Sequence, residues 1–101
     1  MLELNDDTFE SETKNDLVIV EFTASWCPPC KVQKPILEKL EEETKLKVCF
    51  IDYDKNKSTA SKFNIKSLPT LLFFKDGLLV ETKVGLTKVD TINKILDKIK
   101  G

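Results

Sequence analysis

Trp26-Cys27-Pro28-Pro29-Cys30 lies where a strand-like apolar run ends and a helix-like pattern begins, and it holds two of the three cysteines. Proline suits a first helical turn, because its missing N–H has no partner to lose there. A helix beginning at Pro28 places Cys30 one turn beyond Cys27, so the two thiols can form a small disulfide. Cys27 then faces unpaired N–H groups and the positive end of the helix dipole, which favour thiolate over thiol. We expect Cys27 to be the exposed, attacking thiol, with Cys30 a turn inside.

A Cys-x-x-Cys pair has three common interpretations: a redox dithiol, half of a zinc site, or a structural disulfide. A structural zinc site needs four Cys or His ligands, whereas this chain has no histidine and only Cys49 beyond the pair. The lack of histidine also excludes Cys-His and Ser-His catalytic arrangements. We therefore favour thiol–disulfide exchange over the metal and inert-disulfide alternatives, and we expect no metal and no other cofactor. Cys49 lies within a predicted strand, where a cysteine usually behaves as a small hydrophobe.

The stretch from Val20 to Lys31, read as Val-Glu-Phe-Thr-Ala-Ser-Trp-Cys-Pro-Pro-Cys-Lys, resembles the active-site segment of thioredoxins. The resemblance runs from about Phe9 to Ile99 and implies a thioredoxin fold of the α/β class, a three-layer sandwich with a central mixed sheet flanked by helices. Further matches follow in order: the helix-kinking proline at Pro35, the cis-proline loop at Leu68-Pro69-Thr70, the hairpin turn at Lys75-Asp76-Gly77 and the glycine after the last strand at Gly85.

The resemblance also implies an activity, that of a thiol–disulfide oxidoreductase and electron carrier. Such a protein reduces disulfide-containing protein substrates and is recycled by a thioredoxin reductase, which is linked to NADPH or to ferredoxin. Cys27 would attack the substrate, Cys30 would resolve the mixed disulfide, and Glu21 would lie beneath Cys30 and take its proton. The substrate-binding residues implied are Trp26 with a half-exposed ring, Pro28, Leu68, Pro69, Thr70 and Gly85. We further expect a cis peptide bond between Leu68 and Pro69, since cis is inexpensive only before proline.

Three positions depart from the thioredoxin pattern. Most thioredoxins have glycine where this chain has Pro28, and the double-proline form also resembles tryparedoxins, nucleoredoxins and some exported oxidoreductases. The buried aspartate of the family is matched by Glu21, and its partner lysine by Phe50 or a near neighbour. Because apolar residues flank Glu21, we expect desolvation to raise its pKa, with no matching lysine nearby to stabilise the anion.

Length and composition restrict the remaining possibilities. With 101 residues and 41% hydrophobic content, the chain is long enough for one domain, residues 1–101, and too short for two. Sixteen lysines against 17 acidic residues form no basic block, so we expect no nucleic-acid partner. The sequence from Met1 shows no secretory signal and no apolar run near membrane-spanning length. We therefore expect a cytoplasmic monomer without a membrane partner.

Hydrophobic spacing predicts the order α, β, α, β, α, β, β, α. The predicted strands cover residues 17–22, 46–53, 70–74 and 78–84, the last two joined by an Asp76-Gly77 hairpin turn. A short helix carrying Phe9 is expected to be capped by Asp6 or Asp7, and the last helix by a capping box of Thr87 and Asp90. A further helix is predicted at 57–63. The residues expected to face inward are Val32, Ile36, Leu37 and Leu40 in the helix from Pro28, Ala60 and Phe63 in the next, and Val89, Ile92, Ile95, Leu96 and Ile99 in the last.

Two other functions fit the same residues. An oxidase or isomerase would use the same fold with a more oxidising dithiol, and its reduction potential would distinguish it. A binding module within another enzyme would keep its partner's activity after both cysteines are replaced by serine.

Overall fold

The central strand of the sheet is β2 (Leu17–Thr23), a run of β-branched and apolar residues. The computed structural model describes all residues, 1–101. Val18, Val20 and Phe22 belong to one apolar cluster and Ile19 to another, because side chains alternate between the two faces of a strand. Burial on both faces explains why this stretch is continuously apolar.

The sheet is mixed, and its strand order is β1-β3-β2-β4-β5. Both β1 and β2 pair with β3 in parallel. In contrast, β4 runs antiparallel to both β2 and β5. The other strands are β1 (Leu2–Leu4), β3 (Lys47–Asp52), β4 (Thr70–Lys75) and β5 (Leu78–Val84).

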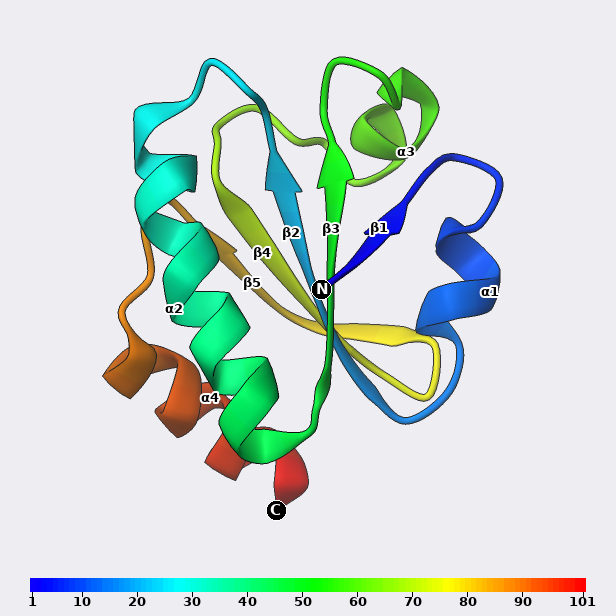
Figure 1. Cartoon of the computed structure of the whole chain (residues 1–101). Helices are drawn as coiled ribbons and strands as arrows, with labels where there is room; N and C mark the ends of the chain where they lie inside the picture. Colours follow the sequence, from blue (N-terminus) through cyan, green and yellow to red (C-terminus); the bar gives the residue numbers. More distant parts are fainter.

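Four helices cover the two faces of the sheet (Figure 1). The helices α1 (Phe9–Thr13) and α3 (Lys57–Lys62) lie on one face, and α2 (Pro28–Thr44) and α4 (Val89–Lys100) lie on the other. Each pair closes its own core, one containing Phe9 and Ala60 and the other Leu37 and Ile92. This arrangement confirms the predicted three-layer α/β sandwich. None of the helices is both long and apolar enough to cross a membrane.

The first strand was not expected from the sequence. β1 has only three residues and pairs with β3 at the edge of the sheet, and Leu4 is its one buried side chain. A three-residue segment is too short to show an alternation of apolar and polar residues. The predicted order of elements therefore began with a helix instead.

Two helices bury most of the residues predicted to face inward, but one predicted residue in each is exposed. In α2 the buried row is Cys30, Gln33, Leu37 and Leu40, so Val32 is 52% exposed. In α4, Val89 is 41% exposed while Ile92, Ile95 and Leu96 are buried. The inner row of α2 begins at Cys30, which is buried beside Cys27. Gln33, a polar residue, lies one turn further along the same row. The helix continues through Pro35 to Thr44.

The predicted helix caps are also wrong. Thr8 precedes α1 without a side-chain cap, and the Asp6 carboxylate instead accepts hydrogen bonds from the N–H and hydroxyl of Thr59, at 2.9 and 2.6 Å. Lys88 precedes α4, and no capping box forms, because the Thr87 hydroxyl donates to the Gly85 carbonyl at 3.1 Å. In both cases a bond to a distant or loop partner replaces the local cap.

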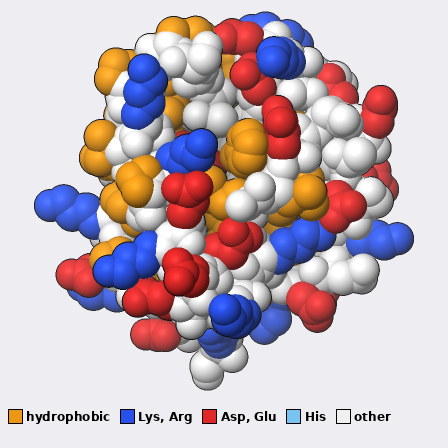
Figure 2. Space-filling view, in the orientation of Figure 1, with side chains coloured by type: hydrophobic (Ala, Val, Ile, Leu, Met, Phe, Trp, Pro, Cys, Tyr) orange, Lys and Arg blue, Asp and Glu red, His pale blue; other side chains and the backbone are white.

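The outer edge of β5 is free of any neighbouring strand. The backbone N–H of Thr82 on this strand donates to the carboxylate of Glu81 at 2.9 Å. A charged side chain bonded to an edge strand hinders pairing with another chain. On the face shown in Figure 2, acidic and basic side chains are interspersed, in keeping with a net charge of −1.

Candidate functional site

The two cysteines lie at the start of α2, as expected. Cys27 is the N-cap residue with extended backbone, Pro28 and Pro29 occupy the first helical positions, and Cys27 and Cys30 form a disulfide with their Cα atoms 5.3 Å apart. The N–H of Cys30 donates to the sulfur of Cys27 at 3.3 Å. The sulfur of Cys27 thus occupies the place of a capping oxygen, where the helix end favours negative charge.

Exposure does not distinguish the two cysteines, contrary to the prediction. Each is only 2% exposed, and both pack with Ala24 and Leu68. Their surroundings do differ. The sulfur of Cys27 accepts a helix N–H, whereas Cys30 lines a partly open cavity together with Glu21.

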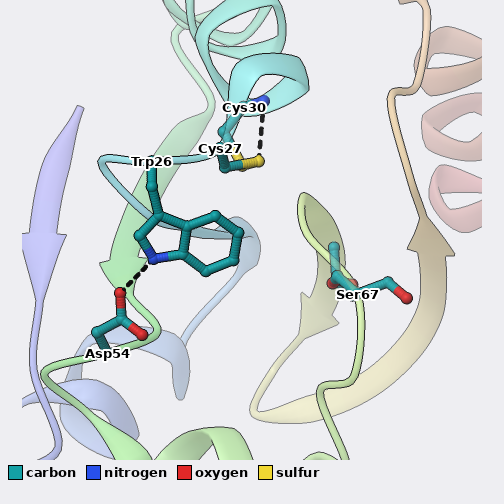
Figure 3. The surroundings of a disulfide bond; sticks show 6 residues. Trp26, Cys27, Cys30, Asp54 and Ser67 are labelled. Carbon is teal, nitrogen blue, oxygen red and sulfur yellow. Dashed lines mark hydrogen bonds between the residues drawn. A yellow bond between two sulfur atoms is a disulfide. The ribbon is translucent and has the colours of Figure 1, made fainter.

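Trp26 stands beside the disulfide with its ring in solvent (Figure 3). The side chain is 62% exposed, which confirms that the ring is not buried. Its indole N–H donates to a carboxylate oxygen of Asp54 at 2.6 Å. Asp54 is positioned by its own N–H, which donates to the Asp52 side chain at 2.9 Å. Sequence reasoning missed Asp54, although its place just after a central parallel strand was a usable signal.

The loop before β4 lies on the other side of the disulfide, as Ser67 in Figure 3 shows. The peptide bond between Leu68 and Pro69 is cis, as predicted. The Pro69 carbonyl accepts the N–H of Gly85 at 2.7 Å. The Thr70 hydroxyl donates to the Ser67 carbonyl at 2.6 Å. These bonds place Leu68, Pro69, Thr70 and Gly85 in one continuous region next to the dithiol.

Glu21 is buried, with 1% exposure, and its Oε2 atom has no hydrogen-bond partner. Burial raises the pKa of Glu21 from 4.5 to about 7, against an opposing attraction from Lys34. A carboxyl group with this pKa gains and loses a proton near neutral pH. The predicted rise is therefore confirmed, and its cause is desolvation.

Glu21 has no lysine at the matching position of the neighbouring strand, as expected, but a lysine of α2 does act on it. Its register partner on β3 is Phe50, which carries no charge. However, Lys34 of α2 lines the same cavity of about 240 Å³ and favours the Glu21 anion. Matching the strands to each other could not predict the effect of Lys34 on Glu21, because Lys34 lies on the helix above the sheet, four residues after Cys30. The cavity is lined by Met1, Glu21, Thr23, Ala24, Ser25, Cys30, Lys31, Lys34, Phe50 and Asp52.

Cys49 lies in β3 and is fully buried in the core beneath α1 and α3. Burial raises the pKa of its thiol to about 11. A thiol with so high a pKa is a poor nucleophile at neutral pH. The structure has no group of three or more His, Cys, Asp or Glu side chains placed to hold a metal ion.

Comparison with known proteins gives consistent matches along the chain. A family model described as thioredoxin matches residues 1–98. Thioredoxin of Bacillus subtilis is 41% identical over 100 residues, which is 97% of this chain and 96% of its own length. Thioredoxin of Listeria monocytogenes is 41% identical over 98 residues, 95% of each chain. Thioredoxin of Staphylococcus aureus is 38% identical over 100 residues, again 97% and 96% of the two chains.

Proposed function

Because the chain belongs to the thioredoxin family and is a protein-disulfide oxidoreductase, we propose that it reduces protein disulfides and is recycled by a thioredoxin reductase. The observation that carries this proposal is the sulfur of Cys27 at the N-terminus of α2, where it accepts the Cys30 N–H. The proposed unit is a single thioredoxin domain, residues 1–101, that acts as a cytoplasmic monomer. Cytoplasmic reductants keep such a dithiol reduced between cycles.

The reaction begins with the reduced dithiol. The Cys27 thiolate attacks one sulfur of a substrate disulfide, forms a mixed disulfide and releases the other sulfur as a thiolate. Cys30 then loses its proton and attacks the Cys27 sulfur, which releases the second substrate sulfur. The substrate gains two electrons, and the Cys27–Cys30 disulfide forms, which is the oxidised state of this structure.

Glu21 is the proposed acceptor of the Cys30 proton. Both residues line the same cavity, and the unpartnered Oε2 atom of Glu21 leaves it free to take up a proton. A pKa of about 7 makes this carboxyl group able to accept the proton and return it to water at neutral pH.

The proposed docking surface surrounds the disulfide. Trp26 offers an exposed aromatic ring, and Pro28 lies between the two cysteines. Backbone groups beside the cis-proline are suited to pair with an extended substrate segment, since main-chain hydrogen bonds need no particular side chain. The docking residues proposed are Trp26, Pro28, Leu68, Pro69, Thr70 and Gly85.

The direct test is insulin reduction with a defined electron source. Purified protein is mixed with insulin and with either NADPH and its thioredoxin reductase or reduced ferredoxin and its reductase. We expect rapid insulin reduction with one system, and none with Cys27→Ser. A wild-type protein that reduces insulin with neither reductase, nor after direct reduction by dithiothreitol, would exclude the proposed function. Efficient oxidation of a reduced substrate instead would indicate an oxidase.

A further inference from the structure

Gln33 is a polar side chain in the apolar interior between α2 and α4. It is fully buried and lies three residues after Cys30 in the inner row of α2, which is otherwise Cys30, Leu37 and Leu40. An apolar residue would fill this position without the cost of burying an amide. The amide is therefore expected to make bonds that offset this cost.

Both ends of the Gln33 amide bond to the backbone of one residue. Nε2 donates to the Thr87 carbonyl at 3.0 Å, and Oε1 accepts the Thr87 N–H at 2.8 Å. This two-bond pairing has the pattern of two residues paired in an antiparallel sheet. It holds the segment between β5 and α4 at a fixed distance from the helix that carries Cys30.

The bonds continue from Thr87 toward the cis-proline. The Thr87 hydroxyl donates to the Gly85 carbonyl at 3.1 Å, and the Gly85 N–H donates to the Pro69 carbonyl at 2.7 Å. A continuous series of hydrogen bonds thus links the helix of Cys30, the segment from Gly85 to Thr87 and the loop at Pro69. Gln33 is the only side chain that joins the helix to this series.

We propose that Gln33 is a positioning residue for protein substrates. Through Thr87 it fixes Gly85 and Pro69 relative to the disulfide, so that an extended substrate segment meets the cysteines in register. Gln33 itself is buried and touches neither substrate nor sulfur. The inference rests on the proposed reductase function, and it concerns recognition of the polypeptide rather than the exchange reaction.

Two disulfides of different size separate recognition from exchange. Prereduced protein is mixed in a stopped-flow instrument with insulin, which needs the docking surface, or with dithiobis(nitrobenzoic acid), which is too small to span it. Gln33→Met keeps the length of the side chain and removes both hydrogen bonds. We expect its rate with insulin to fall about tenfold, the equivalent of roughly one hydrogen bond, with an unchanged rate for the small disulfide. Val32→Met, on the exposed side of the same helix, is the matched control and should behave as wild type with both.

Equal losses with both disulfides, or no loss with insulin, would overturn the inference. Thr87→Val provides a second test should Gln33→Met fail to fold. It removes only the hydroxyl bond to Gly85, and we expect a selective loss with insulin, smaller than that of Gln33→Met. An unchanged insulin rate in Thr87→Val would count against the inference. Failure of wild type to reduce insulin would instead reject the proposed function, so the two failures are distinguishable.

Discussion

The indole N–H of Trp26 and the carboxylate of Asp54 are joined by a hydrogen bond of 2.6 Å, although the residues are 28 positions apart. A largely exposed ring gains little orientation from packing, so this bond is the main restraint on its position. It connects the loop before α2 to the loop after β3. The bond thereby restrains the position of the ring beside the disulfide.

Removing this bond should loosen the ring. We expect Asp54→Ala to lower the rate of insulin reduction several-fold, roughly the effect of losing one charge-assisted hydrogen bond, and to increase the motion of the indole. Because Trp26 is the only tryptophan, time-resolved fluorescence anisotropy reports on this ring alone. Asp54→Asn retains an acceptor and should stay close to wild type. Unchanged anisotropy in Asp54→Ala would show that packing, not the bond, holds the ring.

The two cysteines should differ sharply in trapping experiments. Cys30→Ser leaves the Cys27 thiolate at the helix end without a resolving partner, so it should accumulate a stable mixed disulfide with insulin. Cys27→Ser should trap almost nothing. Because both residues are equally buried, this asymmetry would come from their different surroundings, above all the helix end at Cys27. Non-reducing electrophoresis and mass spectrometry measure it, and equal trapping by both variants would contradict the assignment of Cys27 as the attacking thiol.

Glu21 should make the protein less stable as pH rises. Its folded-state pKa is raised from 4.5 to about 7, so the folded state holds the proton more tightly than the unfolded state does. The free energy of unfolding should therefore fall as pH rises from about 4.5 toward 7 and level off above that range. Glu21→Leu should remove this dependence and stabilise the protein at neutral pH by roughly 2–3 kcal/mol. Urea unfolding across this pH range provides the measurement.

The same variant should lose rate in the second step of the reaction. Without a carboxyl group in the cavity, Cys30 loses its nearby proton acceptor, so the mixed disulfide should persist longer in Glu21→Leu at neutral pH. Glu21→Gln, which is polar but cannot accept the proton, should be slowed similarly. Lower stability or undiminished turnover in Glu21→Leu would leave Glu21 without a catalytic role.

Lys34 should act through Glu21. Its ammonium group favours the Glu21 anion, so Lys34→Met should raise the pKa of Glu21 further. The pH at which resolution of the mixed disulfide reaches half its maximum should move upward with it. Titration of the carboxyl signal by NMR and a pH–rate profile are the two measurements. Lys31→Met is a suitable control, because Lys31 lines the same cavity without shifting this pKa; equal effects of both variants would indicate a general charge effect.

Pro28 should influence the reduction potential. The Pro28 ring fixes φ at the first helical position. Glycine there would give the loop of the reduced protein a conformational freedom that the closed disulfide does not allow. We expect Pro28→Gly to change the potential by about 10–20 mV, the equivalent of typical proline and glycine backbone effects. Equilibration with a glutathione redox buffer measures it, with Val32→Ala as a control in the same helix. A reduction potential identical to that of wild type would show that Pro28 does not influence it.

Much of the site could be predicted from the sequence, because its main signals are local. Two prolines between two cysteines specify the start of α2, and this alone places Cys27 at the helix end. Glu21 is conspicuous because the residues around it are apolar, and the physical effect of burial then predicts the direction of its pKa. The cis bond before Pro69 likewise depends on a residue type that is visible in the sequence.

The missed features depend on contacts between distant segments. Asp54 and Lys34 acquire their importance from Trp26 and Glu21, which meet them only when the loops and layers pack. The hydrophobic spacing of α2 did not determine which of two adjacent residues, Val32 or Gln33, faces the core. Val32 was therefore expected inside, and Gln33 was overlooked. Propensity and spacing describe a helix well, but the neighbours decide which side is covered.

The burial of Cys49 makes its thiol a built-in probe of how often the core opens. In the reduced native protein an alkylating reagent would modify the Cys27 thiolate at the helix end, whereas Cys49 lies on β3 with no exposed surface. Its modification requires the core beneath α1 and α3 to open, so alkylation at Cys49 reports opening of the core rather than a redox change. A simple mass spectrum taken over time then yields an opening rate for the core, without any label having to be introduced.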